Sequence, residues 1–422
     1  MIDPDGLNVW YGQKIVGYLQ QNTQGQISFT YDQDWLIQGF SISCTLPLQA
    51  EDFTAQEGIA HRFFANLLPE AGAREQIVRE LKIANTDFNL LRAIGGECAG
   101  ALSILESQYV PSAVASYYQL NSDDLKKILL RKGQPVRWQE NVHPRLSLAG
   151  AQNKCPVLVN EDGYWLPKQE SPSNAILKFE LTDYRHLPAY ETFTTLLAQK
   201  IGLPVVDIRL QQHEGIFFAQ IKRYDRLAEN NGEIIRLHQE DLCQALGYGY
   251  DKKYQEEGGP GFVDCYRLVQ RTSSRPLIDL PNLLNWMIFN VLAGNSDAHA
   301  KNLSLLYSPQ GIRLAPFYDL ICTRAIERID YRLAMAVGTE RNPSLISQKH
   351  WVELAEQCGI SKKLVLKQVE AIAQKLLTTL PECRLEFNHH YHDYPALLRI
   401  EQVVKKQCAR TLADLFVRHC RA

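Results

Sequence analysis

Short runs of alternating apolar and polar residues open the chain, and turn-forming residues separate them. Because side chains in a strand point to opposite faces in turn, this alternation predicts strands. The predicted strands are residues 9–11, 14–18 and 27–31. Apolar residues then recur at Ile59, Phe63 and Leu67, a spacing that predicts a helix packed on the sheet. The segment 95–100 is expected to lead the chain back into a short strand.

The middle of the chain is also rich in strand patterns. The predicted strands are residues 155–159, 164–167, 175–179, 205–210 and 216–222. A helix is predicted at residues 191–201, since Gly202-Leu203-Pro204 is a strong helix stop. The polar stretch 103–122 contains Pro111 and is the predicted linker between the first strands and this region.

Beyond Arg226 the apolar residues follow a helical period to the end of the chain. The spacing from Leu283 to Val291 predicts a buried helix that ends at Gly294. Two short strands are expected after it, at residues 303–307 and 312–315. A small strand-rich lobe followed by a larger helical one predicts an α+β fold.

Composition and charge narrow the classes of function. The 422 residues carry 45 Lys and Arg against 47 Asp and Glu, a formal net charge of −2. This near-balance excludes a strongly basic, chain-wide nucleic-acid binder and leaves room for a local basic patch. The chain starts without a signal-peptide pattern, no segment reaches about 18–20 continuous apolar residues, and the ten cysteines are scattered singly. We therefore expect a cytoplasmic protein of two or three domains, with reduced thiols and no membrane contact.

The strongest chemical signal follows the predicted buried helix. Asp297 and Asn302 are five positions apart in the segment Asn295-Ser296-Asp297-Ala298-His299-Ala300-Lys301-Asn302. This spacing fits the D-x-x-x-x-N loop of phosphoryl-transfer enzymes, in which the Asp accepts a hydroxyl proton and the Asn binds a magnesium ion. Taken alone, the motif is more readily explained by two side chains that cap turns.

Further residues in the same order favour phosphoryl transfer. Asp319 ends the pair of short strands after the loop, where a kinase has its second magnesium ligand. Lys178 stands in an apolar strand, and a buried ammonium group needs an anion such as a phosphate or Glu191. The alternative for Lys178 is an edge-strand lysine whose charged end reaches solvent.

No G-x-G-x-x-G and no G-x-x-x-x-G-K-[ST] motif occurs in the chain. Before the first strand of the middle region lies the segment 146–154, Leu-Ser-Leu-Ala-Gly-Ala-Gln-Asn-Lys. Its small residues can expose backbone N–H groups to phosphates, and Lys154 can add positive charge. By itself, any turn of small residues has a similar pattern.

Together these motifs resemble those of HipA-type kinases, the toxins of bacterial HipBA toxin–antitoxin pairs. The segments that carry the resemblance are residues 146–154, 176–179, 223–226, 238–244, 296–302 and 316–320, with residues 9–18, 64–70 and 95–100 near the N-terminus. The resemblance implies a bilobal, protein-kinase-like α+β fold. A HipA-like N-terminal domain is expected at residues 1–110, a strand-rich N-lobe with the phosphate loop at 111–224, and a helical C-lobe with the catalytic loop at 225–422.

The resemblance also implies roles for single residues. Asp297 matches the catalytic base, Asn302 and Asp319 match the magnesium ligands, and Lys178 matches the lysine that binds the ATP phosphates. The phosphate loop is matched by Ala149, Gly150, Ala151, Gln152, Asn153 and Lys154. The hinge that contacts adenine, largely through backbone groups, is matched by Lys222, Arg223 and Tyr224. His299 and Tyr318 follow the HipA pattern where ordinary protein kinases differ, and they complete the implied nucleotide site.

Ser147 matches the serine that members of the family autophosphorylate. A phosphate there would put nearly two negative charges beside those of ATP, which is a physically sensible off-switch. The resemblance thus implies an ATP- and Mg²⁺-dependent serine/threonine protein kinase that phosphorylates a translation component such as an aminoacyl-tRNA synthetase. It also implies a HipB-like helix-turn-helix antitoxin dimer as partner and a corepressor role on operator DNA, contacted mainly through the antitoxin.

Two other functions stay open at this point. One is a catalytically inactive corepressor of the same fold, and the other is a small-molecule kinase with a similar Asp–Asn loop. Retention of the catalytic residues argues against the first, and the N-terminal domain and the Ser147 segment argue against the second.

Three remaining features are not expected to take part in the chemistry. The basic residues of the last helix are Lys405, Lys406, Arg410, Arg418 and Arg421, and solvation is a better explanation for them than DNA contact. His389, His390 and His392 are expected in a solvated loop and not in a metal site. The glycine-rich segment 258–261 is expected to form a loop near the cleft.

Overall fold

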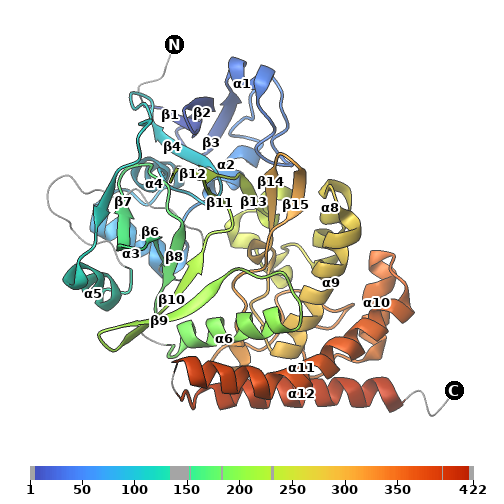
Figure 1. Cartoon of the computed structure of the whole chain (residues 1–422). Helices are drawn as coiled ribbons and strands as arrows, with labels where there is room; N and C mark the ends of the chain where they lie inside the picture. Colours follow the sequence, from blue (N-terminus) through green and yellow to red (C-terminus); the bar gives the residue numbers. More distant parts are fainter. Residues whose placement is uncertain are drawn as a thin grey trace. The chain divides into compact units, whose positions relative to one another are not determined.

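The computed structural model describes residues 5–133, 152, 154–181, 184–229, 232–391 and 393–417. Contacts divide the chain into two compact units, which we describe one at a time (Figure 1). The first unit contains Met1–Phe179, Gln212–Asp251 and Ser304–Pro309, and the second contains Glu180–Gln211, Lys252–Leu303 and Gln310–Ala422. The boundaries expected near residues 110 and 224 stay predictions.

An antiparallel sheet of order β3-β2-β1-β4 opens the first unit. Its strands are β1 (Leu7–Tyr11), β2 (Lys14–Gln21), β3 (Ile27–Tyr31) and β4 (Leu102–Glu106). The helices of this region are α1 (Gln33–Gln38), α2 (Ile59–Ala65), α3 (Ala71–Leu81) and α4 (Asp87–Ile94). Helix α2 packs on β3 and α4 packs on β4, so Phe29, Phe63 and Phe64 are fully buried between sheet and helices. The three strands and the helix predicted for this region are confirmed.

The predicted linker at residues 103–122 is wrong. Strand β4 and strand β5 (Tyr117–Gln119) both fall within or across it. Ile104 is completely buried opposite Val9 of β1, so this polar-looking stretch has an apolar partner in the first sheet. A cross-strand partner far away in the sequence overrides the local polarity.

A second sheet of the first unit has the strand order β5-β7-β6-β8-β10, with β9 (Ile208–His213) next to β10. Its other strands are β6 (Lys154–Asn160), β7 (Gly163–Pro167), β8 (Ala175–Lys178) and β10 (Ile216–Lys222). Helix α5 (Ser122–Leu130) packs against β10, and Val157, Leu177 and Phe218 are buried in this core. Four of the five predicted strands are confirmed closely. The strand predicted at residues 205–210 begins at Ile208 instead of residue 205.

The helical pattern expected directly beyond Arg226 is wrong up to residue 241. Strands β11 (Arg226–Ala228) and β12 (Ile234–Arg236) form an antiparallel pair, and β13 (Gln239–Asp241) pairs with β14 (Ser304–Ser308). Three-residue strands are too short to show a period in the sequence. Helix α7 (Leu242–Leu246) then begins with a capping box between Asp241 and Gln244.

The second unit is mostly helical. Its elements are α6 (Leu187–Lys200), α8 (Phe262–Thr272), α9 (Pro276–Ala293), β15 (Gly311–Leu314), α10 (Gln348–Cys358), α11 (Lys362–Tyr391) and α12 (Leu397–Val417), with short 3₁₀ turns η2 (Gln255–Glu257), η3 (Ala300–Asn302) and η4 (Thr323–Ala325). Figure 1 shows α11 and α12 side by side, and α11 also packs on α6, α9 and α10. The buried helix and the helical tail are confirmed, and α6 starts four residues earlier than predicted because Pro188 fits its first turn.

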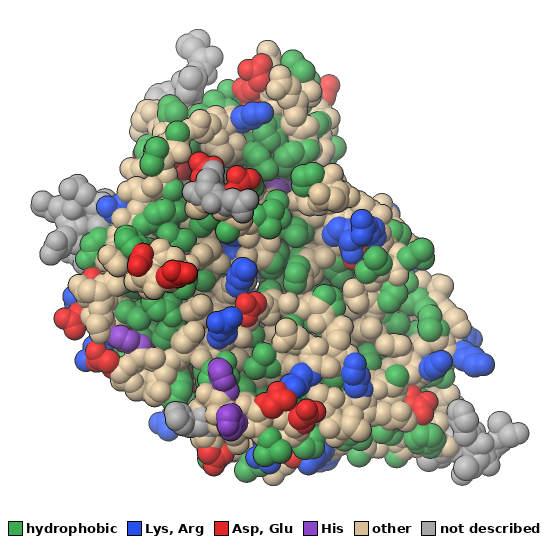
Figure 2. All heavy atoms as spheres, viewed as in Figure 1, with side chains coloured by type: hydrophobic (Ala, Val, Ile, Leu, Met, Phe, Trp, Pro, Cys, Tyr) green, Lys and Arg blue, Asp and Glu red, His purple; other side chains and the backbone are tan. Residues whose placement is uncertain are grey.

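His389 and His390 lie in the last turn of α11, so the loop expected there is wrong, while both side chains are exposed. His392 lies outside the described residues. Within the described ranges no helix is both long and apolar enough to cross a membrane. The nine cysteines of these ranges are free thiols, of which Cys44 is exposed and the rest are buried. Figure 2 shows acidic and basic side chains interspersed on the face in view.

Candidate active site

The segment from Asn295 to Asn302 follows α9 in the second unit. Helix α9 ends at Gly294, whose φ of 75° is the left-handed conformation that glycine adopts without strain. Asn295 then donates from Nδ2 to Oδ1 of Asn290 at 2.8 Å, and its own Oδ1 accepts from the backbone N–H of Asp297 at 3.1 Å. Ser296 N donates to Thr323 Oγ1 at 2.7 Å. Buried side-chain amides and hydroxyls therefore fix the loop from Asn295 to the backbone of Asp297.

Asp297 projects from this fixed loop with its side chain 49% exposed. Tyr254 donates its hydroxyl to Oδ1 of Asp297 at 2.7 Å. His299 Nε2 lies 3.9 Å from the same oxygen, and this contact is an ion pair only when the imidazole is protonated. A carboxylate that is anchored at one oxygen and open to solvent can accept a proton from a bound hydroxyl group.

Asn302 closes the loop. Its Nδ2 donates to the backbone carbonyl of Asp297 at 3.0 Å, across the turn η3, and the residue is 7% exposed. The five-residue spacing of the motif is thus the span of one short turn. Since the nitrogen of the amide is used in this way, its oxygen is the atom left to bind a cation.

Asp319 has a φ of +58°, a left-handed conformation that few residues other than glycine adopt. Its neighbours hold it there, because Phe317 pairs with Val205 in a parallel bridge and Leu320 is 1% exposed. Tyr318 donates its hydroxyl to the carbonyl of Lys301 at 2.9 Å, which ties this segment to the loop 295–302. Strained backbone of this kind concentrates at functional sites.

The donor set of this region fits a magnesium ion. Asn302 and Asp319 supply an amide oxygen and a carboxylate, the hard oxygen ligands that Mg²⁺ prefers, and magnesium sites usually have only one or two such protein ligands. The remaining positions of such an ion are normally filled by water and by phosphate oxygens of the substrate.

In the first unit, two lysines stand directly opposite each other. Lys154 begins β6 and Lys178 ends β8, and the antiparallel register pairs them. Lys178 is 4% exposed, so the expectation of a buried strand lysine is confirmed, while Lys154 is half-buried. Residues directly opposite each other in an antiparallel pair point to the same face of the sheet. The two lysines therefore share one face, and they are candidates for phosphate binding.

The phosphate loop is described only in part. Gln152 donates from Nε2 to the carbonyl of Phe179 at 2.7 Å, directly after Lys178. Ser147, Ala149, Gly150, Ala151 and Asn153 lie outside the described residues. Glu191 is buried in α6 of the second unit, with 3% exposure.

Of the three predicted hinge residues, Lys222 ends β10, and Arg223 and Tyr224 follow it. Lys222 is exposed, while Tyr224 donates its hydroxyl to Gln239. Arg223 is 3% exposed, and its guanidinium group donates to Asp225 Oδ1 at 2.9 Å and to Glu97 Oε1 at 2.9 Å. The side chain of Arg223 is thus used inside the protein, and its backbone N–H donates to the carbonyl of Asn174 at 2.9 Å, so the predicted contact with adenine stays a prediction.

Arg223 belongs to a buried ion cluster of five residues, Glu97, Arg223, Asp225, Arg226 and Arg236. Burial would raise the pKa of the Glu97 carboxyl, but the charges of the three arginines outweigh burial and lower that pKa. The pKa of Asp225 is also lowered, since the arginines on either side overcome the effect of burial. Burial and the charge of Arg223 lower the pKa of Arg226 to about 10. Glu97, Asp225 and Arg226 therefore remain charged at neutral pH.

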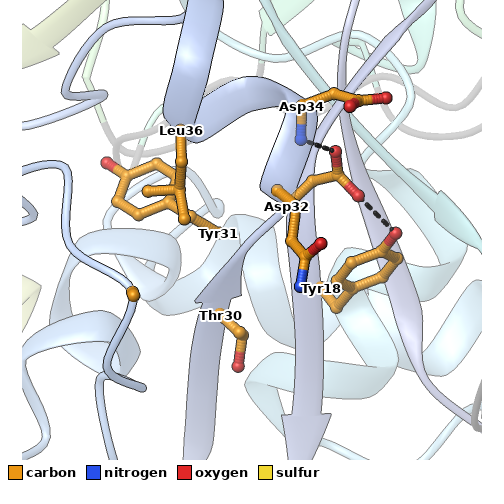
Figure 3. A pocket seen from close by; sticks show the side chains of 8 residues that line it. Tyr18, Thr30, Tyr31, Asp32, Asp34 and Leu36 are labelled. Atoms are coloured by element: carbon orange, nitrogen blue, oxygen red, sulfur yellow. Dashed lines mark hydrogen bonds between the residues drawn. The ribbon is translucent and has the colours of Figure 1, made fainter.

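A separate hollow of about 720 Å³ lies beside the first sheet, lined by residues of β2, β3 and α1. Figure 3 shows that the carboxylate of Asp32 is used internally there. It accepts from Tyr18 Oη at 2.7 Å and from the backbone N–H of Asp34 at 2.9 Å. Burial and the bond to Asp32 raise the pKa of Tyr18 to about 12. These groups maintain the start of α1 and offer no free nucleophile.

The sequence did not predict two features of the site. One is the ion cluster, because Glu97 lies more than 120 residues from its arginine partners. The other is Tyr254, since it stands 43 residues before Asp297 and no spacing rule connects them. Its position four residues before the glycine-rich segment is the only local signal that points toward the site.

The α+β fold, the Asp–Asn loop and the facing lysines define a phosphotransferase of the kinase class. Comparisons with known proteins agree. The family model of the HipA N-terminal domain matches residues 7–105, and that of the HipA-like C-terminal domain matches residues 146–380. "Putative kinase Y4mE" from Sinorhizobium fredii is 35% identical over 391 residues, which cover 88% of this chain and 92% of the relative.

The serine/threonine-protein kinase toxin HipA of Shewanella oneidensis is 30% identical over 395 residues, covering 89% of this chain and 88% of the relative. The solved structure of HipA from Shewanella oneidensis with HipB and its operator DNA superposes with a TM-score of 0.83 at 25% identity, covering 97% of this chain and 98% of that chain. This chain belongs to the HipA family. The expected family, the α+β kinase-like fold and the enzyme class of serine/threonine protein kinase are confirmed.

Proposed function

We propose that this protein is the toxin of a HipBA-like pair and transfers the γ-phosphoryl group of ATP to serine or threonine residues of a translation component, such as an aminoacyl-tRNA synthetase. The observation that carries the proposal is the loop itself. Asp297 presents a half-exposed carboxylate on a backbone that buried amides hold, and Asn302 closes the loop behind it. Catalysis of phosphoryl transfer consists mainly of such positioning.

In the proposed reaction, Asp297 accepts the proton of the acceptor hydroxyl while the oxygen of that hydroxyl forms its bond to the γ-phosphorus. The bond between the γ-phosphorus and the bridging oxygen breaks, and ADP leaves. Asn302 and Asp319 are the residues that would hold Mg²⁺, which supplies charge neutralisation at the phosphates when bound.

Lys154 and Lys178 are the proposed phosphate-binding lysines. Their opposite positions in β6 and β8 support this role, because the register places both side chains on the same face of the sheet. Gln152, bonded to Phe179 beside them, supports the assignment of residues 149–154 as the phosphate loop. Lys222 to Tyr224 would contact adenine through their backbone, and His299 and Tyr318 would complete the nucleotide site.

The proposed regulation has two parts. Autophosphorylation at Ser147 would inactivate the kinase by adding negative charge beside the phosphate loop. A HipB-like antitoxin dimer would bind the toxin in the cytoplasm, and the complex would repress its own operator, contacted mainly through the antitoxin. The solved complex of the Shewanella relative with HipB and operator DNA supports this partner. In α12, Lys405 pairs with Glu401 and Arg410 donates to Gln407, which supports a minor role for this helix in DNA binding.

The test is phosphoryl transfer by the purified full chain. We would incubate it with Mg²⁺ and γ-labelled ATP, map the phosphate by mass spectrometry and use Asp297→Ala as the control. Label at Ser147 that disappears in the control is the expected result. Absence of both label and ATP binding would contradict the proposal and favour an inactive corepressor. ATP consumption only after addition of a small metabolite would instead indicate a small-molecule kinase.

A further inference from the structure

Tyr254 is the residue whose hydroxyl contacts the carboxylate of Asp297, with Oη 2.7 Å from Oδ1. Its ring also meets the ring of His299 edge to face, at 5.4 Å between centroids and 75° between planes. His299 Nε2 lies 3.9 Å from the same Oδ1. The contacts that the described part of the chain makes with this carboxylate therefore converge on one of its two oxygens.

The backbone around Tyr254 is itself fixed to the segment that follows Asp319. Gln255 N donates to the carbonyl of Ala334 at 3.2 Å, and Gln255 Oε1 accepts from Ala336 N at 2.7 Å. Glu256 pairs with Arg332 at 3.0 Å and with Arg341 at 2.5 Å. Tyr254 thus lies on an anchored segment, and its hydroxyl is delivered to Asp297 from a defined direction.

That segment in turn contacts the catalytic loop next to Asp297. Ser296 Oγ donates to the carbonyl of Asp330 at 2.7 Å, and Ala334 N donates to the carbonyl of Ser296 at 2.9 Å. Residues 254–256, residues 330–341 and the catalytic loop form a closed set of contacts around one carboxylate. A tyrosine with only a structural role would not require these contacts, because its hydroxyl could donate to any nearby carbonyl or to water.

We propose that Tyr254 is a positioning residue for the phosphoryl transfer proposed above, on which this inference rests. Its hydroxyl holds Oδ1 of Asp297 and so presents Oδ2 to the acceptor hydroxyl. The torsion that turns a free aspartate carboxylate is broad and roughly two-fold, so an unheld carboxylate samples orientations that do not meet the acceptor. A donor to a charged oxygen is a strong hydrogen bond and narrows that range. During transfer the acceptor proton moves to Oδ2, and Tyr254 keeps its own proton.

The test compares Tyr254→Phe with Tyr266→Phe in the full-length protein. The first variant keeps the ring beside His299 and removes only the hydroxyl. Tyr266 is a buried tyrosine of α8 in the same unit whose ring packs on Phe262, so its variant controls for loss of a hydroxyl as such. The probe is autophosphorylation from γ-labelled ATP in single turnover, measured over a range of ATP concentrations. Thermal melting and ATP affinity check that each variant is folded.

We expect Tyr254→Phe to lower the maximal rate about tenfold to a hundredfold, the cost of a misplaced catalytic group. The ATP concentration at half-maximal rate should change less than twofold, and Tyr266→Phe should keep the wild-type rate. In an Asp297→Asn background the tyrosine substitution should have almost no further effect, because the two residues act through one contact.

Three results would overturn the inference. These are an unchanged maximal rate in folded Tyr254→Phe, an increased rate, which would make the tyrosine an obstacle to the acceptor, and an equal loss in the Asp297→Asn background. A wild-type protein that transfers no phosphate would overturn the proposed function and this inference together. Full activity of Tyr254→Phe would overturn this inference alone.

Discussion

Two carboxylates, Glu97 in the first unit and Asp297 in the second, show how differently this protein uses negative charge. Glu97 is completely buried and contacts the guanidinium groups of Arg223, Arg226 and Arg236. Asp297 has a side chain that is 49% exposed and accepts one hydrogen bond from a neutral tyrosine. The first carboxylate is compensated on all sides, whereas the second keeps an oxygen for a visiting group.

The comparison separates structural from chemical carboxylates. A buried carboxylate among cations has its pKa held low and cannot take up a proton at neutral pH, so it serves folding. A half-exposed carboxylate on a rigid loop is open to a bound hydroxyl group, which is the role proposed for Asp297. Substitutions at the two positions should therefore fail in different ways.

Asp297→Asn should distinguish the two carboxylates most clearly, because it keeps the shape of the side chain and removes its charge. Loss of a general base lowers the rate by about 10²–10⁴-fold. We expect that loss in autophosphorylation, with the melting temperature close to wild type, because the side chain is half exposed. Asp393→Asn, an exposed carboxylate of the same unit, is the control and should retain full activity. A melting temperature that fell along with activity would show that Asp297 is also structural.

The converse substitution is Glu97→Gln, which should lower stability. Removing one partner of a buried ion pair costs about 3–5 kcal/mol, since the remaining charges stay buried without compensation. Urea unfolding would measure this as a lower midpoint. Glu214→Gln removes an exposed ion pair with Lys126 in the same unit and should leave the midpoint near wild type. Equal shifts for both variants would argue against a structural role of the cluster.

His238 extends the comparison to a base of the first unit. It is buried with Nε2 2.7 Å from the carbonyl of Ile42, and burial lowers its pKa from 6.5 to about 4. The unfolded chain takes up a proton below about pH 6.5 and the folded protein does not, so stability is complete above that pH and falls as pH drops toward 4. The free energy of unfolding falls by about 3 kcal/mol over this range. Urea midpoints across this range should show it, and a His238→Gln variant should show a flatter profile.

The smallest expected effect concerns the lysine pair of β6 and β8. Lys154→Met removes one of two facing ammonium groups, so the ATP concentration at half-maximal rate should rise about tenfold, equivalent to about 1.4 kcal/mol. Lys168→Met, just after β7, is the matched control. Unchanged ATP dependence in Lys154→Met would contradict the assignment of this pair to phosphate binding.

Much of the candidate site could be predicted because its signals are local. Asp297 and Asn302 are separated by one short turn, so their spacing survives in the sequence. Lys178 stood out as a charge in an apolar strand, and its 4% exposure agrees. The long helices α9, α11 and α12 were visible from their apolar period over many residues.

The features that sequence reasoning missed depend on partners far apart in the chain. Strands β11 and β12 are three residues long and exist through their pairing. Glu97 stands in a glycine-rich segment that gives no hint of three arginines more than 120 residues away. Tyr254 reaches Asp297 only because residues 255 and 256 are fixed to a third segment. Such contacts are set by tertiary structure, which no local pattern records.

The position of Glu97 has a consequence for dissecting the protein. The two family models match separate modules of this chain, of which one ends at residue 105 and the other begins at residue 146. Yet Glu97 of the first module contacts Arg223, Arg226 and Arg236 of the second. A truncated protein that starts after residue 110 would keep Arg223, Arg226, Arg236 and Asp225 and lose Glu97, which leaves an excess of two positive charges in the cluster. The counterion of these arginines therefore comes from the other module, and both modules have to be expressed together for the ion cluster to be complete.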